Sequence, residues 1–509
     1  MRGIDIRELL QPSVYPHTVE RIQLRETHIS WVILTGSFAY KVKKPIKLDF
    51  LDMTDPSQRC FLCHEELRLN RRLAPDLYVD VVSITRDEHG VHVGGSGSAV
   101  DYAVRMKQFD ASQELPALLE RDDVSGAEMA TLAARLADFH IQATRSDATG
   151  DLDYRNGLSH SVKSSLATLS AHCQGSAGNA ELGRLVDWTH DTLQELSPAV
   201  AEREASGFVR ECHGDLHAHN IVRWDDRLTP FDCLEFDARL RFIDVMSDIA
   251  FLFMDLVSYR RDDLAYQFLS SYLEVTGDYG GTRWLVFYAV HRALVRAMVD
   301  ALGAEQRPAD SEPLIGRMSA RIRTAVEFTR ARKPTLYIMH GLSGSGKSWL
   351  SERLVPKLGC IRIRSDIERK RLLQAADAGD GQTAEASRYT PEKRELIYRR
   401  LMDCAKPSLE AGVSVIIDAT FLGSADRQAF RALAARSAAR FVIVACTADK
   451  TEIVRRLENR SRQDPSDANV AIFEKQCEQL EALSAAEERE VVRVDTASAD
   501  WESQVRALD

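Results

Sequence analysis

The sequence lacks the features that mark membrane, secreted and nucleic-acid-binding proteins. None of its apolar runs approaches the roughly 20 residues that are needed to cross a bilayer, and its first 17 residues have no apolar core of the kind found in secretory signals. Basic residues are not in excess either, since the formal net charge at pH 7 is −10, whereas nucleic-acid-binding proteins are usually basic. We therefore expect a cytoplasmic protein with no membrane and no nucleic-acid partner.

The cysteines also do not form the pattern of a disulfide framework. There are nine, an odd number scattered along the chain, and thiols in the cytosol stay reduced. One group, Cys60-Phe-Leu-Cys63-His64, matches the spacing of c-type haem attachment. That chemistry belongs to exported proteins, and two ligands alone do not close a zinc site. We interpret these cysteines as ordinary residues of a helix.

The length of 509 residues predicts more than one domain. Short strand patterns and one helix fill an N-lobe at about 15–110, and mainly helical patterns follow in a C-lobe at about 111–332. From residue 333 the pattern changes to strands that alternate with helices, which is typical of an α/β domain with a parallel sheet. We expect two domains, 1–332 and 333–509, the second with five strands at 335–340, 360–364, 413–418, 440–446 and 491–495.

A complete phosphate-binding loop follows the first of these strands. The segment GLSGSGKS fits G-x-x-x-x-G-K-[ST], with an apolar strand before it and a helical pattern after it. Backbone N–H groups of such a loop wrap the phosphates, while its lysine reaches the β- and γ-phosphates and its final hydroxyl binds Mg²⁺. The loop therefore predicts ATP and Mg²⁺ as ligands, bound by Gly341, Ser343, Gly344, Ser345, Gly346, Lys347 and Ser348.

Carboxylates and arginines supply the other parts expected of a phosphotransferase. Asp418 ends the third strand, where P-loop proteins carry a carboxylate that supports the Mg²⁺ shell. Asp366 follows the second strand, where it either holds the acceptor hydroxyl or caps a helix, and both roles are compatible. Arg460 and Arg462, downstream of Arg455 and Arg456, are either part of a lid over the transferred phosphoryl group or a solvated basic face.

The segments GLSGSGKS, RSDIERKRL, VIIDATF and EKQCEQLEAL resemble those of P-loop kinases related to zeta toxins and gluconate kinase, over essentially all of residues 333–509. The resemblance implies kinase activity, with an acceptor pocket built between the second and third strands. The residues there include Arg388, Tyr389, Lys393 and Arg394, which suit an anionic or polyhydroxyl acceptor.

A second catalytic pattern lies in the N-terminal half. His213-Gly-Asp215-Leu-His217-Ala-His219-Asn220 places an Asp five residues before an Asn, the pair that in protein-kinase-like folds accepts the hydroxyl proton and holds Mg²⁺. Asp232, twelve residues after Asn220, stands where the metal-binding Asp of such folds is expected. This motif resembles that of the aminoglycoside phosphotransferase and choline kinase group. Asp244 and Asp248 match residues that brace the loop in that group. A zinc site made by the histidines is the less favoured alternative.

The N-lobe matches this group more loosely. Phe38-Ala-Tyr-Lys41 has the form of the strand that carries the phosphate-binding lysine, with Lys43 as the alternative. Its partner is expected on the next helix, at Glu66 or else at Glu65. The turn at residues 25–30 has no glycine, so the Gly-rich phosphate loop is missing.

Both halves in this order resemble bacterial bifunctional aminoglycoside phosphotransferase-like/ATP-binding proteins. The resemblance implies an N-terminal α+β kinase-like fold joined to a C-terminal α/β P-loop fold, and two phosphotransferase centres that act on small-molecule acceptors. Two alternatives stay open. In the first, the N-terminal half is a pseudokinase or sensor that controls a single P-loop kinase. In the second, the protein is a nucleotide-binding partner or toxin-like module.

Overall fold

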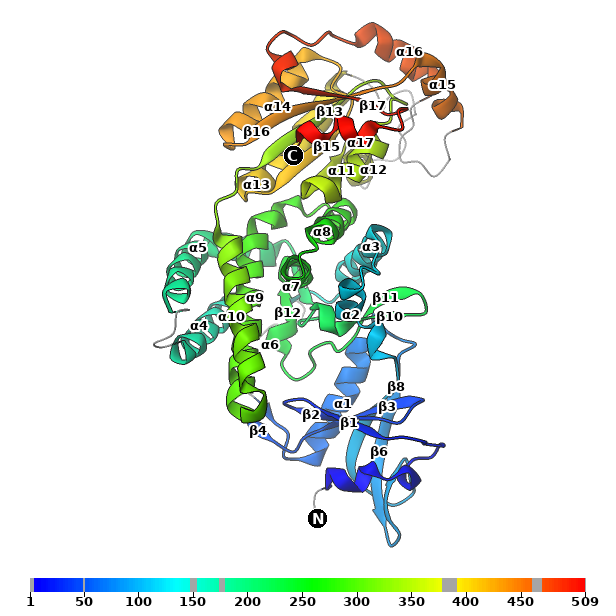
Figure 1. Ribbon diagram of the computed structural model, residues 1–509, viewed down its shortest axis with the longest axis vertical. Helices are drawn as coiled ribbons and strands as arrows, with labels where there is room; N and C mark the ends of the chain where they lie inside the picture. The colour runs from blue at the N-terminus through cyan, green and yellow to red at the C-terminus, as the bar shows by residue number, and fades with distance from the viewer. Residues whose placement is uncertain are drawn as a thin grey trace. The chain divides into compact units, whose positions relative to one another are not determined.

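The computed structural model describes residues 4–48, 51–146, 153–173, 179–377, 391–459 and 469–508. Its N-terminal part contains a six-stranded antiparallel sheet with the strand order β1-β2-β3-β8-β6-β7 (Figure 1). Alternating apolar residues of β2 and β3 form one face of its core, as the sequence pattern predicts. The sequence did not predict β7. The strands are β1 (Gln23–Glu26), β2 (Ser30–Leu34), β3 (Phe38–Lys43), β6 (Tyr78–Asp87), β7 (Gly90–Val93) and β8 (Ser98–Lys107), and a separate short pair is β4 (Lys47–Leu48) with β5 (Leu51–Asp52).

Helix α1 (Pro56–Asn70) packs against β6 and β8 and carries the Cys60–Cys63 pair. Its first turn is capped by Asp55, whose side chain accepts a hydrogen bond from the Ser57 N–H, and Pro56 occupies the first helical position. Cys63 is buried in the core of this lobe, and burial raises the pKa of its thiol to about 12. The pair therefore belongs to a packed helix, as expected.

The rest of the N-terminal half is mainly helical, interrupted by two short strand pairs that frame the His213–Asn220 segment. The pairs are β9 (Val209–Glu211) with β12 (Phe242–Asp244), and β10 (Ile221–Trp224) with β11 (Arg227–Pro230). The helices are α2 (Leu115–Glu120), α3 (Gly126–Gln142), α4 (Tyr154–His172), α5 (Asn179–Ala205), α6 (Ala238–Arg241), α7 (Val245–Ser258), α8 (Asp262–Thr276), α9 (Thr282–Gln306) and α10 (Ser311–Thr329).

The C-terminal part is a five-stranded parallel sheet with the strand order β14-β15-β13-β16-β17. The five strands lie within one residue of the ranges expected from the sequence, because each is a short apolar run buried in the sheet. They are β13 (Thr335–His340), β14 (Cys360–Arg364), β15 (Ser414–Asp418), β16 (Arg440–Thr447) and β17 (Val491–Asp495).

Helices cover this sheet and leave the carboxyl ends of its strands at one edge. Tyr337 and Met339 of β13 pack with Leu350 and Leu354 of α11 on one face, while α13 and α14 contact β15 and β16. Parallel strands present their carboxyl ends together, so the segments that follow β13, β14 and β15 are neighbours. The helices are α11 (Lys347–Leu358), α12 (Ser365–Asp377), α13 (Pro391–Glu410), α14 (Ser424–Arg436), α15 (Lys450–Glu458), α16 (Val470–Gln479) and α17 (Trp501–Gln504).

The chain forms two compact units. One unit comprises Met1–Val124, Asp138–Asp255 and Ala289–Val326, and the other comprises Ser125–Ala137, Leu256–Tyr288 and Glu327–Asp509. The second unit includes α8, which contacts α11 and β14. Within the described residues, no helix is long and apolar enough to cross a membrane.

Candidate active sites

The P-loop joins β13 to α11 through a backbone path that only glycine fits well. Gly344 and Gly346 have φ angles of +84° and +86°, in the left-handed region. A Cβ atom on Gly346 would lie 2.6 Å from Thr496 Oγ1, and one on Gly341 would lie 2.6 Å from the Cys446 carbonyl oxygen. The glycines therefore let the loop turn tightly and pack against the ends of β16 and β17.

Lys347 and Ser348 begin α11 directly after this turn. Lys347 is buried, and its Nζ donates to the carbonyl of Leu342 at 2.9 Å within the same loop. Ser348 is exposed in the first helical turn. The two side chains thus lie at a helix N-terminus, where backbone N–H groups and the helix dipole favour an anion such as phosphate.

The two predicted carboxylates follow neighbouring strands. Asp418, the last residue of β15, is buried, and its Oδ2 accepts from Ser351 Oγ at 3.1 Å. Asp366 lies in the first turn of α12, directly after β14, and forms an ion pair with Arg369 at 2.9 Å. Because α12 begins at Ser365, Asp366 is a first-turn residue rather than the helix cap. A carboxylate there is also favoured by the helix dipole.

The oxygen donors at this edge fit the chemistry of Mg²⁺. Hydroxyl and carboxylate oxygens are the ligands that this cation prefers, and Ser348 and Asp418 supply one of each. Ser351 links α11, which carries Ser348, to the carboxylate of Asp418. The residues that could hold a cation are therefore connected through the helix that begins at the P-loop.

One arginine of α15 and one glutamine of α16 contact the P-loop. Arg456 donates to Thr496 Oγ1 at 2.9 Å and lies 3.5 Å from the Gly344 carbonyl, while Arg455 forms a pair with Glu452 at the surface. Gln476 Oε1 accepts from the Ser343 N–H at 2.8 Å. The sequence reasoning missed Gln476, although it lies within the EKQCEQLEAL segment. The predicted Arg460 and Arg462, as well as Arg388 and Tyr389, lie outside the described residues.

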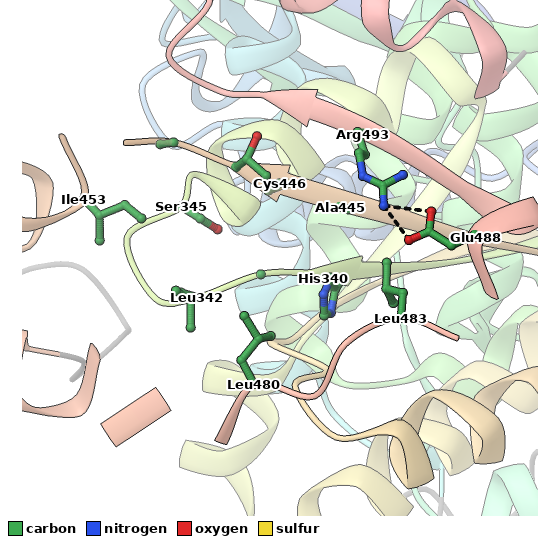
Figure 2. A pocket seen from close by; sticks show the side chains of 13 residues that line it. His340, Leu342, Ser345, Ala445, Cys446, Ile453, Leu480, Leu483, Glu488 and Arg493 are labelled. Carbon is green, nitrogen blue, oxygen red and sulfur yellow. Dashed lines mark hydrogen bonds and ion pairs between the residues drawn. The ribbon is translucent and has the colours of Figure 1, made fainter. Parts of the chain in front are cut away.

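A pocket of about 290 Å³ adjoins the start of the P-loop (Figure 2). His340 Nδ1 contacts the Phe421 carbonyl at 3.0 Å, so this nitrogen carries the proton and Nε2 is the acceptor. Burial lowers the pKa of His340, which keeps the ring neutral. The pocket is lined by His340, Gly341, Leu342, Ser345, Ala445, Cys446, Thr447, Ala448, Ile453, Leu480, Leu483, Glu488 and Arg493.

The second candidate site lies on the loop between β9 and β10. Asn220 Nδ2 donates to both the carbonyl and the carboxylate of Asp215, at 3.0 Å each. His217 Nε2 lies 3.3 Å from the same carboxylate. Burial disfavours the charge of Asp215, but His217, together with Arg296 and His213, outweighs this effect, so the pKa of Asp215 is lowered. Asp215 is thus an ionised carboxylate in position to accept a proton.

Asp248 stabilises this loop through hydrogen bonds to its backbone. Its carboxylate accepts from the N–H groups of His213 and Gly214, at 2.9 and 3.0 Å, and lies 3.2 Å from His140 Nε2. In the described part of the chain, the group with metal-ligating geometry is His140, Cys212 and Asp248, not the three histidines of the motif. Asp248 already binds the loop backbone there, so we assign this group to structure.

The predicted N-lobe residues form a buried charge cluster, and the partly exposed Asp232 contacts it through Lys41. Lys41 Nζ lies 2.9 Å from Glu66 and also contacts Asp232, whereas Lys43 contacts Glu66 and Glu235. Burial opposes ionisation of Glu66, but Lys41 and Lys43 lower its pKa to about 2. The geometry distinguishes Lys41, which touches Asp232, from Lys43.

Glu65, the alternative partner, forms ion pairs with Arg68 and Arg241 instead, at 2.7 and 2.8 Å.

The β1–β2 turn, which has no glycine, is held by its own hydrogen bonds. The β1–β2 turn is closed by the Thr27 N–H, which donates to the Ser30 carbonyl at 2.9 Å, and by the Ser30 N–H, which donates to Thr27 Oγ1 at 3.0 Å. These two donors are therefore engaged within the turn.

Comparison with known proteins finds a family match in the C-terminal part and relatives along most of the chain. The AAA_33 family model, described as an AAA domain, matches residues 336–483. An uncharacterized protein of Mycobacterium tuberculosis strain H37Rv, Rv2004c, is 28% identical over 454 residues, which are 89% of this chain and 88% of that protein. A Mycobacterium bovis protein, Mb2027c, matches equally well.

Solved structures resemble each half separately. A gluconokinase from Sinorhizobium meliloti is 20% identical over 35% of this chain and 91% of its own, with a TM-score of 0.26. A choline kinase from Cryptosporidium parvum is 10% identical over 64% of this chain and 94% of its own, with a TM-score of 0.40.

Proposed function

We propose that this protein is an ATP-dependent phosphotransferase with two kinase centres, which transfers the γ-phosphate to hydroxyl groups of small molecules. For the P-loop centre, the observation that carries the proposal is the convergence of the P-loop, Asp418 and Asp366 at one edge of the parallel sheet. That arrangement combines phosphate binding with carboxylates suited to a cation and to an acceptor.

At the P-loop centre, Asp366 holds the acceptor hydroxyl and takes its proton as the oxygen attacks the γ-phosphorus. The bond between this phosphorus and the β–γ bridging oxygen breaks, and ADP leaves. Lys347 gives up its contact with the Leu342 carbonyl and binds the phosphates instead. Mg²⁺, held at Ser348 and supported by Asp418, would neutralise charge on the β- and γ-phosphates.

The acceptor of this centre is an anionic or polyhydroxyl molecule. Arg369 forms an ion pair with Asp366 at 2.9 Å. Lys393 and Arg394 lie in the first turn of α13, where Arg394 pairs with Asp426 of α14. A cation beside a proton-accepting carboxylate attracts an anionic acceptor and suits the transfer of a phosphoryl group.

At the N-terminal centre, Asp215 takes the hydroxyl proton, while Asn220 and Asp232 are the residues suited to a cation and Lys41 to the α- and β-phosphates. Glu66 orients Lys41 through their ion pair. A second function for this half, that of a ligand sensor without turnover, is favoured by one observation. The β1–β2 turn uses its own N–H groups internally instead of offering them to phosphate.

A metabolite screen with γ-labelled ATP and Mg²⁺ tests both proposals when it is run in parallel on the wild type, Asp215→Ala and Lys347→Ala. Two centres predict that each variant loses a different labelled product. If only Lys347→Ala loses product, the N-terminal half is a sensor. If the wild type labels no small molecule, the phosphotransferase proposal is wrong, and the nucleotide serves an interaction.

A further inference from the structure

Three arginines of the P-loop part meet the last turn of α8. Glu274 Oε2 lies 3.1 Å from Arg362 Nη2, and its Oε1 lies 3.0 Å from Arg364 Nη1. Arg371 donates to the backbone carbonyl of Glu274 at 2.9 Å. The carboxylate and the negative end of the helix dipole both favour cations at this place.

Other contacts fix α8 against β14 in the same compact unit. The Arg362 N–H donates to Ser270 Oγ at 3.0 Å, one turn before Glu274. Tyr266 packs closely on Gly359, where an added Cβ would lie 3.2 Å from its ring. Glu274 is therefore held in place by the helix and not by its ion pairs alone.

The two strand arginines lie beside the proposed cation site. Arg364 is the direct neighbour of Asp418 in the parallel register of β14 and β15, so their side chains leave the same face of the sheet. Arg362, two residues earlier on that face, lies 3.3 Å from the Ser348 carbonyl and 3.5 Å from Ser351 Oγ. The hydroxyl of Ser351 is the one that binds Asp418.

We propose that Glu274 is a positioning residue of the P-loop centre, which holds Arg362 and Arg364 away from Asp418 so that this carboxylate stays available to Mg²⁺. Both guanidinium groups are largely buried, with side chains 11% and 15% exposed, so their charges need a partner. Without the charge of Glu274, Arg364 has a carboxylate in its register neighbour Asp418. An arginine paired with Asp418 opposes cation binding through direct competition and charge repulsion.

This inference rests on the proposed ATP and Mg²⁺ binding at the P-loop, and the test separates the two. The affinity of the full chain for a fluorescent ATP analogue is measured in Mg²⁺ and in EDTA. Binding that is lost in Lys347→Ala is assigned to the P-loop. The variants are Glu274→Gln, Arg364→Gln, the double variant and Glu274→Asp. Asp263→Asn serves as the control, because Asp263 lies on the same helix and forms its ion pair with Arg261.

We expect Glu274→Gln to shrink the Mg²⁺-dependent gain in affinity by about fivefold or more, with affinity in EDTA unchanged or tighter because a freed arginine attracts phosphate. Glu274→Asp and the double variant should recover most of the gain, and Asp263→Asn should behave as the wild type. Equal weakening in Mg²⁺ and EDTA would mean that Glu274 is only structural. A double variant as impaired as Glu274→Gln would also overturn the inference. If the wild type shows no Lys347-dependent binding, the proposed function falls together with the inference.

Discussion

The amine of Lys41 lies 2.9 Å from the carboxylate of Glu66 and also contacts Asp232, so that β3, α1 and the segment after β11 meet at one charged centre. Lys43, two residues further along the same strand face, is fully buried between Glu66 and Glu235. The two lysines thus share Glu66 and differ in their second partner, which is Asp232 for Lys41 and Glu235 for Lys43. Only Lys41 touches the carboxylate that is suited to a cation.

We predict that Lys41→Met abolishes the Asp215-dependent product, because it removes the cation that binds the phosphates, and that it lowers stability less than Lys43→Met does. Lys43→Met leaves Glu235 as an uncompensated buried charge and should cost about 3–5 kcal/mol of unfolding free energy. Product formation and thermal melting of both variants provide the measurement. A stable but inactive Lys43→Met protein would assign the phosphate-binding role to Lys43 instead.

A second prediction concerns the tight P-loop turn. Gly346→Ala places a Cβ 2.6 Å from Thr496 Oγ1 at a residue with φ of +86°. We expect a strain of about 1–3 kcal/mol and loss of Lys347-dependent nucleotide binding, because the N–H groups of the loop are displaced. The control is Gly316→Ala, a site in α10 with open space around it, where alanine should stabilise the helix by about 0.5–1 kcal/mol. Equal nucleotide affinity in Gly346→Ala and wild type would contradict the assignment of this loop to phosphate.

The sequence predicted local features well and long-range ones poorly. The five strands of the parallel sheet are close to the expected ranges because each is a buried apolar run with its own signature, and the P-loop is a contiguous motif. Gln476 could not be predicted, since its role depends on a contact with Ser343, 133 residues away. Nor could the place of α8, because an amphipathic helix does not reveal which neighbour its apolar face will meet.

Glu66 and Glu65 are adjacent acids of α1. Helical spacing relative to Leu73 favoured Glu66 and left Glu65 as the alternative. The structure turns Glu66 inward, fully buried, and leaves Glu65 to pair with Arg68. The strand β7 was missed for a different reason, since its four residues lie between turn-forming segments and are too short for a clear alternation.

A third prediction separates the two carboxylates at the sheet edge. Asp366→Asn removes the proposed proton acceptor, so phosphoryl transfer should slow by about 10²–10⁴-fold while nucleotide affinity stays nearly the same. Asp418→Asn should instead raise the Mg²⁺ concentration that is needed for half-maximal nucleotide binding, because it weakens the support of the cation. Single-turnover rates and binding titrations measure the two effects. If Asp366→Asn reduced binding and transfer equally, its role would be that of a first-turn carboxylate in α12.

The last prediction concerns pH and His291 of α9, which is 5% exposed and whose Nε2 lies 3.1 Å from Ser161 Oγ. Burial, with a smaller contribution from Arg292, lowers its pKa from 6.5 to about 3. Below about pH 6.5, His291 therefore binds a proton in the unfolded chain but stays neutral in the folded protein. The free energy of unfolding falls as the pH drops from that value toward the pKa of His291 in the folded protein.

At about pH 5, the cost of keeping His291 neutral should be about 2 kcal/mol relative to about pH 7.5. His291→Gln removes this cost, so the difference in unfolding free energy between the variant and the wild type should shift by that amount in favour of the variant. Urea unfolding at the two pH values measures the shift. His89→Gln serves as the control because its side chain is 77% exposed. A difference between His291→Gln and wild type that does not change with pH would show that His291 takes up its proton equally in the folded and unfolded chains.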